Sequence, residues 1–367
     1  MKRRQFLSGA AVVGATAAAA STFAKPAIAQ DKREWRMVTT WPKNYPGLGT
    51  GAELLAKYIT EASEGRLTVK VFGAGEIVPA FESIEAVGTG AVEMGHGAPY
   101  YWKGKVPATE FIASMPFGLT AQEQNAWFYY FGGQELADKA YAELNCKFFA
   151  SGNTAATMGG WYNKEINSIA DFNGLKIRIP GLGGEVLKAA GSNVVNLPGG
   201  ELAPALQTGS IDAVDWVGPY NDLAFGLYKS AKYYVHPGWY EPATVLDNFI
   251  NLDAWNELPA DLKAIVEAAN KAVNVMVMSE FTARNNDALK TLIEKHNVQL
   301  KRLSDDTIKG LGKLTGEVLS DVAARDPLAK EVFDSLIKFR TQSVAWSKIS
   351  EGGFMEARAM DYAFPTS

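Results

Sequence analysis

Apolar and polar positions along the first hundred residues follow two different periods. One set alternates residue by residue, as in half-buried strands, and the other recurs every three to four residues, as in amphipathic helices. The expected strands are 34–40, 67–72 and 91–94, and the expected helices between them are 49–63 and 77–87. The third strand opens into a loop that contains Tyr100 and Tyr101. This order predicts parallel βαβ units with right-handed crossovers.

The same pattern restarts after a largely helical segment at 122–144. The expected strands are 147–151, 157–162, 175–179 and 194–197, with a glycine-rich loop at 181–184 and a helix at 185–190. The restart carries an internal repeat: GEIVPA at 75–80 resembles GELAPA at 200–205, and 89–93 resembles 208–215. Long helices are then expected at 262–291, 307–324 and 328–350. We predict an α/β fold in which two similar lobes exchange strands through short hinges and face each other across a cleft.

The composition is that of an ordinary soluble globular protein. The chain has 367 residues, 47% of them apolar, and a net charge of −4; it is long enough for two domains and has no basic excess for nucleic acid. The single cysteine, Cys146, cannot form an internal disulfide and is expected to be a small core residue. His96, His236 and His296 lack the spacing of a zinc or iron site. The glycine-rich loop fails as a dinucleotide motif at Val186, and the sequence has no nucleophile elbow or phosphate loop.

The first 29 residues resemble an export signal. Arg3 and Arg4 precede Gln-Phe-Leu, an apolar run of small residues follows at 8–23, and Ala-Ile-Ala at 27–29 is a cleavage site of the A-x-A type. Twin arginines are typical of the route that carries folded proteins across the inner membrane. No later apolar run approaches the roughly 18 residues needed to span a bilayer. We therefore expect a mature chain that starts near Gln30 and is free in the periplasm.

Candidate binding chemistry centres on Arg178. Asp171-Phe-Asn-Gly174 is typical of a turn, the alternating strand 175–179 follows, and Pro180 ends the strand because it has no N–H to donate. Arg178 is thus expected at the carboxyl end of a strand, the edge at which ligands bind in open α/β sheets. Its planar guanidinium can pair a carboxylate through two parallel hydrogen bonds. The alternative is a surface arginine beside a neighbouring acidic residue.

Two carboxylates form a second candidate cluster. Asp215 and Trp216 end the last strand of the second repeat, and Glu241 follows the aromatic run HPGWY. Carboxylates in apolar surroundings need a cation, which could be Arg178 or a hard metal ion bound by oxygen atoms. The alternative is that both carboxylates form hydrogen bonds at loop starts and that Tyr100 and Trp216 are core aromatics.

Five motifs together resemble the periplasmic solute-binding proteins of TRAP (tripartite ATP-independent periplasmic) transporters. They are TTWP at 39–42, GNT at 152–154, MGGW at 158–161, DFNGLKIRIP at 171–180 and DWVGPYN at 215–221. The resemblance covers essentially the whole mature chain and is closest to the branch that binds 2-oxo acids and lactate with a metal ion. It implies the two-lobed periplasmic binding protein fold, with a hinge cleft that closes over an organic acid and long C-terminal helices.

The resemblance also implies roles for individual residues. Arg178 would bind the ligand carboxylate, and Asn153, Tyr100 and Tyr220 its second oxygen and rim, with Trp41 and Tyr101 along the wall. A sodium or calcium ion would bridge ligand and protein through Asp215, the Trp216 carbonyl, Glu241 and Thr157. This sequence departs from the branch in two places, because Asp215 replaces a longer glutamate and Thr157 replaces a glutamine. The branch also dimerises by swapping a C-terminal helix, which would explain the apolar residues Trp346, Phe354 and Phe364 of the tail.

The hypothesis is therefore a periplasmic TRAP receptor for a small monocarboxylate, a 2-oxo acid such as pyruvate or a 2-hydroxy acid such as lactate. Its partners would be the membrane subunits of the transporter and a second copy of the chain. The expected divisions are an export signal at 1–29, a first lobe at 30–152 with 244–283, a second lobe at 153–243 with 284–330, and a C-terminal dimerisation segment at 331–367. The alternatives are a periplasmic metal-dependent enzyme that acts on a 2-oxo acid, and a scaffolding protein, which would not explain Arg178 and the paired carboxylates.

Overall fold

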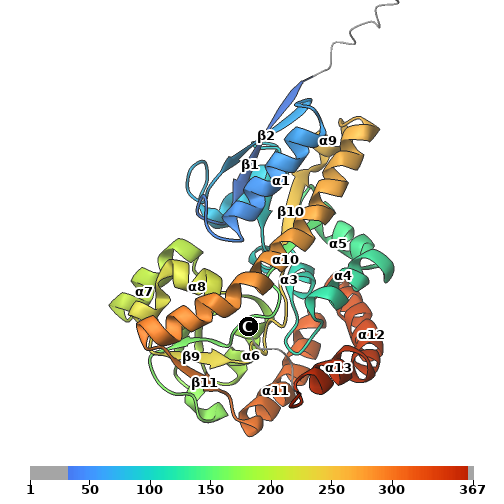
Figure 1. Cartoon of the computed structure of the whole chain (residues 1–367). Coiled ribbons are helices and arrows are strands. Elements are labelled where there is room, and N and C mark those ends of the chain that lie inside the picture. The colour runs from blue at the N-terminus through green and yellow to red at the C-terminus, as the bar shows by residue number, and fades with distance from the viewer. Residues whose placement is uncertain (1–31, 363–367) are drawn as a thin grey trace, which may run out of the picture.

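The computed structural model describes residues 32–362, which form two β-sheets with helices packed around them (Figure 1). The expected export signal lies outside the described residues, as does Phe364. Within the described part of the chain, no helix combines the length and the apolarity needed to cross a membrane.

The first sheet has five strands in the order β2-β1-β3-β10-β4. These are β2 Leu67–Phe72, β1 Arg33–Thr39, β3 Met94–Gly97, β10 Val245–Asn251 and β4 Cys146–Asn153. β1 pairs in parallel with β2 and β3, which confirms the predicted βαβ units, whereas β10 runs antiparallel to β3 and β4. The prediction of a strand at 91–94 is wrong in its bounds. β3 lies further along the chain because Gly95 lets it pack against the Phe249 ring, which would lie 2.1 Å from a Cβ at that position.

The second sheet has six strands in the order β11-β9-β5-β8-β6-β7. These are β11 Gln299–Arg302, β9 Tyr233–His236, β5 Gly160–Tyr162, β8 Ala213–Val214, β6 Lys176–Arg178 and β7 Asn193–Val195. β6 pairs in parallel with β7 and β8, as the repeat predicted, and β5 is antiparallel to β8 and β9. The downstream half of the repeat has the same local structure in both lobes. Gly90 and Gly209 each follow a helix, adopt a left-handed backbone conformation and precede a strand.

The chain passes repeatedly between the two sheets. We call the part built on the five-stranded sheet the first lobe and the part built on the six-stranded sheet the second lobe. The chain leaves the first lobe after β4, returns to it as β10, and crosses again along α10 (Ala260–His296) before β11. Figure 1 shows α10 running along both lobes, and this helix packs on α1 and β4 of the first lobe and on α8 of the second. The prediction of exchanged strands and long C-terminal helices is thus confirmed.

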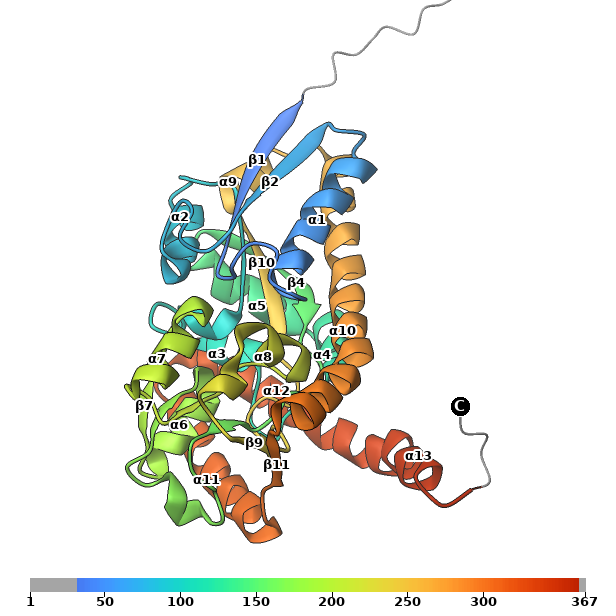
Figure 2. The ribbon, with the colours of Figure 1, turned by 60° about the vertical axis from the view of Figure 1, so that its left-hand side comes forward.

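The remaining helices cover the sheets. They are α1 Gly49–Ala62, α2 Ser83–Gly88, α3 Ala108–Ala113, α4 Ala121–Tyr130, α5 Gly133–Ala142, α6 Gly181–Ala189, α7 Leu202–Thr208, α8 Pro219–Phe225, α9 Leu252–Asn256, α11 Asp305–Ala323, α12 Pro327–Ile349 and α13 Glu351–Arg358. The predicted helix at 77–87 is shorter than expected, because Pro79 precedes a 3-10 turn at Ala80–Glu82 before α2 begins. In Figure 2 α13 extends away from the two lobes, and none of its residues is buried.

The predicted loop at 181–184 is wrong, because these glycines form the first turn of α6. A Cβ on Gly183 would lie 2.8 Å from the Tyr240 Cβ, and one on Gly184 would lie 2.8 Å from the Ile179 carbonyl oxygen. The glycines therefore permit close packing of the helix start, a tertiary requirement that outweighs their low helix propensity.

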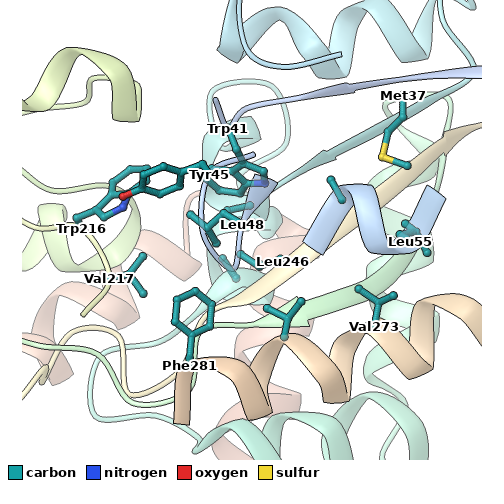
Figure 3. Close-up of a cluster of buried hydrophobic side chains, with 14 of the residues drawn as sticks. Met37, Trp41, Tyr45, Leu48, Leu55, Trp216, Val217, Leu246, Val273 and Phe281 are labelled. Carbon is teal, nitrogen blue, oxygen red and sulfur yellow. The ribbon is translucent and has the colours of Figure 1, made fainter. Parts of the chain in front are cut away.

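The two lobes contact each other directly. The Tyr45 hydroxyl of the first lobe donates to the Asn221 carbonyl of the second at 2.6 Å, and the Asn221 amide donates back to the Pro46 carbonyl at 2.6 Å. The Tyr45 ring stacks on Phe225 with 4.1 Å between centroids. Figure 3 shows Trp216 of the second lobe beside Tyr45 and Trp41 of the first. The structure is therefore a closed arrangement of the lobes.

Candidate functional site

Arg178 lies at the carboxyl end of β6 and is only 1% exposed. Its Nε donates to the Leu197 carbonyl at 3.0 Å, Nη1 to the Asp215 carbonyl at 3.0 Å, and Nη2 to the Tyr101 hydroxyl at 3.4 Å. The guanidinium carbon also lies 5.2 Å from the centroid of the Trp216 ring, in a cation–π contact. Because Arg178 is buried between the lobes, the alternative of a surface arginine is wrong.

Asp215 and Glu241 are buried beside Arg178. Asp215 follows β8; its Oδ1 accepts from the Tyr240 hydroxyl, and its Oδ2 has no hydrogen-bond partner among the described residues. This Oδ2 lies 3.8 Å from Arg178 Nη1. The Glu241 Oε2 accepts from the Thr244 hydroxyl at 2.6 Å.

The electrostatics of this pair follow chiefly from burial. Burial, and secondly the Glu241 charge, raise the pKa of Asp215 well above its usual value. Burial raises the pKa of Glu241 to about 7. Arg178 opposes both shifts, but one guanidinium cannot balance two carboxylates. The site is therefore short of positive charge when both carboxylates are ionised.

Aromatic side chains enclose this charged group. Tyr100 and Tyr101 lie with 4.7 Å between ring centroids, and the Trp41 ring centroid lies 6.1 Å from that of Tyr101 and 6.2 Å from that of Trp216. Burial raises the pKa of Tyr100 well above its usual value, and the charge of Glu241 raises it further, so its hydroxyl remains protonated. An apolar enclosure of this kind strengthens every charge–charge interaction inside it.

The structure brings most of the predicted site residues together around Arg178. Asn153 and Tyr220 instead form hydrogen bonds with residues outside this cluster. Thr157 joins the cluster, because its hydroxyl donates to the Glu241 backbone carbonyl at 2.6 Å. The Asn153 amide donates to Gln124 at 2.8 Å. The Tyr220 hydroxyl donates to Glu280 on α10 at 2.9 Å. In this closed arrangement Asn153 and Tyr220 therefore support the surrounding fold.

Sequence reasoning missed Tyr240 and Thr244, which bond to the two carboxylates. The Tyr240 hydroxyl lies within hydrogen-bond distance of both Asp215 Oδ1 and the Met158 carbonyl. Tyr240 ends the aromatic run HPGWY and directly precedes Glu241, so the sequence itself indicates a hydroxyl near the carboxylates. Nothing in the local sequence indicates that Thr244 would turn back toward Glu241.

The residues at this site suit a hard cation. Among the described residues, no three His, Cys, Asp or Glu side chains gather into a group that could hold a metal. A soft or borderline metal, which prefers sulfur and nitrogen ligands, has no such set in residues 32–362. Asp215 Oδ2 is buried and has no hydrogen-bond partner in the part of the chain that the structure describes. It is an oxygen atom suited to sodium or calcium, and Glu241 and backbone carbonyls could complete the ligands.

Two α/β lobes that exchange strands around a buried arginine are typical of the two-lobed periplasmic binding protein fold. The chain matches the family model "Bacterial extracellular solute-binding protein, family 7" over residues 37–326, and it belongs to this family. It is therefore a periplasmic solute receptor of a TRAP transporter, and the family assignment excludes the enzyme alternative.

Relatives with known ligands share nearly the whole chain. A "monocarboxylate 2-oxoacid-binding periplasmic protein" of Nostoc is 43% identical over 358 residues, which cover 96% of this chain and 97% of that protein. A TRAP solute-binding protein from Pseudoalteromonas atlantica, solved with sodium and pyruvate, is 40% identical with a TM-score of 0.87, covering 90% of this chain and 100% of that one. One from Colwellia psychrerythraea, solved with calcium and pyruvate, is 40% identical with a TM-score of 0.86, covering 89% and 99%. One from Bordetella bronchiseptica, solved as a mixed-occupancy dimer with calcium and picolinate, is 33% identical with a TM-score of 0.87, covering 90% and 99%.

Proposed function

We propose that this receptor binds a small 2-oxo monocarboxylate, such as pyruvate, together with a sodium or calcium ion, and delivers it to the membrane subunits of its transporter. The observation that carries the proposal is the buried pair of Arg178 and Asp215. The arginine has donors to spare, and the carboxylate Oδ2 has no hydrogen-bond partner among residues 32–362. The ligands of the relatives that are about 40% identical support the choice of acid and ion.

Arg178 would bind the ligand carboxylate. A guanidinium has five N–H donors, and the hydrogen bonds to Leu197, Asp215 and Tyr101 use three of them. The remaining donors, on a side chain already fixed by its other partners, suit the planar geometry of a carboxylate. Tyr100, Tyr101 and Trp41 would form the wall that excludes water from this contact.

The ion would be held by oxygen atoms of the protein and of the ligand. Asp215 and Glu241 would supply carboxylate oxygens, Trp216 its backbone carbonyl and Thr157 its hydroxyl. When bound, the ion supplies the positive charge that offsets the two carboxylates and polarises the ligand oxygens toward it. The branch that this chain resembles has glutamate and glutamine at the positions of Asp215 and Thr157. The shorter side chains here leave fewer side-chain oxygens that can extend to the ion.

The identity of the ligand is tested by releasing it from protein purified without added acid. Mass spectrometry of the denatured sample should detect a 2-oxo or 2-hydroxy monocarboxylate, and calorimetry of the emptied protein should show saturable binding of pyruvate. Release of a dicarboxylate or a sugar acid, together with no heat on addition of pyruvate, would contradict the proposal.

We further propose that the receptor forms a homodimer through its C-terminal segment and is exported by the twin-arginine route. Trp346 and Phe354 are 67% and 63% exposed, which is more apolar surface than an unpartnered tail needs. The export proposal rests on Arg3 and Arg4, and replacing both by lysine should leave the protein in the cytoplasm. Correct export of that variant would instead indicate the general secretory route.

We also propose that the lobes move as units with boundaries at the strand exchanges, namely 30–152 with 244–283 and 153–243 with 284–330. The support is that β1 to β4 and β10 share one sheet, and β5 to β9 and β11 the other. Comparison of ligand-free and ligand-bound crystal forms, with the rigid segments assigned from the difference, tests these boundaries.

A further inference from the structure

His96 is buried at the centre of the first lobe, and both of its ring nitrogens have partners. It lies on β3 between β1 and β10, with no exposed surface. Its Nδ1 accepts from the Trp41 indole Nε1 at 3.0 Å, and its Nε2 lies 3.2 Å from the Ser151 carbonyl oxygen. An indole nitrogen can only donate and a carbonyl can only accept, so the imidazole must be neutral with its proton on Nε2.

This arrangement fixes the orientation of Trp41. The indole has one polar atom, and that atom is held by His96. Burial lowers the pKa of His96 to about 4, so the acceptor on Nδ1 persists at neutral and mildly acidic pH. An edge of the Trp41 ring is thereby anchored to the central strand of the first sheet.

Trp41 in turn contacts aromatic residues on two sides of Arg178. On the first lobe it lies against Tyr101, whose hydroxyl accepts from Arg178. On the second lobe it meets Trp216 edge to face, with 76° between the ring planes, and Trp216 lies beneath the guanidinium. Figure 3 shows Trp41 and Trp216 on separate ribbons, with the Tyr45 ring drawn between them in this view. The Trp41–Trp216 contact joins the two lobes.

We propose that His96 is a positioning residue for ligand binding: its Nδ1 fixes the Trp41 indole so that Trp41 meets Trp216 and Tyr101 around Arg178 when the lobes close. This inference rests on the proposed function for its ligand. His96 would make no contact with that ligand and would act through Trp41 alone.

Two substitutions separate the two hydrogen bonds of His96. In His96→Asn the side-chain oxygen lies near the position of Nδ1 and can still accept from Trp41, whereas the contact with Ser151 is lost. In His96→Gln the amide reaches the position of Nε2 and can still donate to Ser151, whereas the acceptor for Trp41 is lost. Asn248→Ala is a matched control, because Asn248 faces His96 across β10 and β3 and is buried, but donates to the Gly95 carbonyl.

The experiment measures pyruvate affinity in sodium chloride by calorimetry and the indole Nε1–H resonances of the ligand-free proteins by NMR. We expect His96→Asn and Asn248→Ala to bind pyruvate within about threefold of the native protein, although both lower the melting temperature. His96→Gln should weaken binding by about tenfold or more and shift the Trp41 indole resonance. Equal loss of affinity in His96→Asn and His96→Gln, or native affinity in His96→Gln, would overturn the inference.

Failure of the proposed function can be distinguished from failure of the inference about His96. If the native protein itself binds no pyruvate, the proposed function fails, and the indole resonance still tests the role of His96 without a ligand. An unshifted Trp41 resonance in His96→Gln would then overturn the inference, and a shifted one that His96→Asn restores would support it.

Discussion

The Tyr101 hydroxyl of the first lobe accepts a hydrogen bond from Arg178 of the second lobe at 3.4 Å. The residue expected to bind the ligand carboxylate is thus also a point at which the two lobes meet. The proposed contact between Arg178 and the ligand would therefore couple binding to closure, because a displaced guanidinium would disturb both.

Replacing Arg178 by lysine should weaken pyruvate binding by roughly ten- to hundredfold, since loss of a charge-assisted hydrogen bond costs about 1.5–3 kcal/mol. An ammonium keeps the charge but cannot reproduce the planar pair of donors. Calorimetric titration measures the effect, with Arg302→Lys as a control because Arg302 is 58% exposed and pairs with Asp305 at the surface. Unchanged affinity in Arg178→Lys would move the carboxylate site elsewhere.

Lys103 joins the lobes at the rim of the site. Its Nζ lies 3.1 Å from Glu110 of the first lobe and 2.9 Å from Glu185 on α6 of the second. Opening would separate Lys103 from Glu185 but not from Glu110. Because a partly exposed ion pair contributes about 0.2–1 kcal/mol, Glu185→Gln should speed ligand release by about 1.4- to fivefold.

Stopped-flow displacement measures this release rate. Glu165→Gln is the matched control, because it removes an ion pair with Lys301 that lies within the second lobe, at 2.8 Å. Equal release rates in the native protein and Glu185→Gln would show that the rim pair does not hold the closed state.

Asp247 should make the fold less stable as the pH rises. It is fully buried and accepts from the Trp102 indole and the Tyr141 hydroxyl, and burial raises its pKa to about 6. A carboxyl whose pKa is higher in the folded state stabilises the fold below its unfolded pKa, and this contribution is lost as the pH rises through about 6. His96 has the opposite effect, because its lowered pKa of about 4 favours folding at higher pH.

Urea unfolding between pH 4 and pH 7 tests this prediction by comparison with Asp247→Asn. The free energy of unfolding of the native protein should fall by about 2–3 kcal/mol relative to the variant across this range, at about 1.4 kcal/mol for each unit of pKa shift. Parallel pH profiles for the two proteins would mean that Asp247 does not titrate differently in the folded state.

The C-terminal segment should be needed for dimerisation. Val332 and Leu336 of α12 are buried in the first lobe, so the truncation should keep α12, remove the residues after Ser350 and carry Trp346→Ser to remove the other exposed aromatic residue. Light scattering at micromolar concentration should find the full-length protein dimeric and the truncated protein monomeric, with equal melting temperatures under dilute conditions. A monomeric full-length protein would contradict the dimer proposal.

The sequence allowed the local elements to be predicted where periodicity is strong. The strand 67–72 has the expected bounds, and Arg178 lies at the end of a strand as its flanking turn and proline indicated. Contacts between distant segments were not predictable in this way. The Trp41–His96 hydrogen bond joins residues 55 positions apart, and the glycine-rich start of α6 depends on the packing of Gly183 against Tyr240. Tyr220 lies in the expected motif, but its hydroxyl bonds to α10, which only the tertiary structure reveals.

The central claim is that Asp215 and Glu241 need a cation before the pocket can hold a carboxylate. When both carboxylates are ionised, three like charges would otherwise repel one another in an apolar enclosure where, within residues 32–362, Arg178 is the cation that opposes them. Glu241→Gln should weaken binding of the ion while leaving the fold intact, because an amide oxygen is a poorer ligand of nearly the same shape.

The most direct measurement is a calorimetric titration of the emptied, metal-free protein with pyruvate in sodium chloride, in calcium chloride and in choline chloride at equal ionic strength. We expect tight binding with sodium or calcium and at least tenfold weaker binding with choline alone. Equal affinity in all three, with elemental analysis that finds no bound metal, would contradict the account and leave Asp215 and Glu241 as hydrogen-bonding residues only.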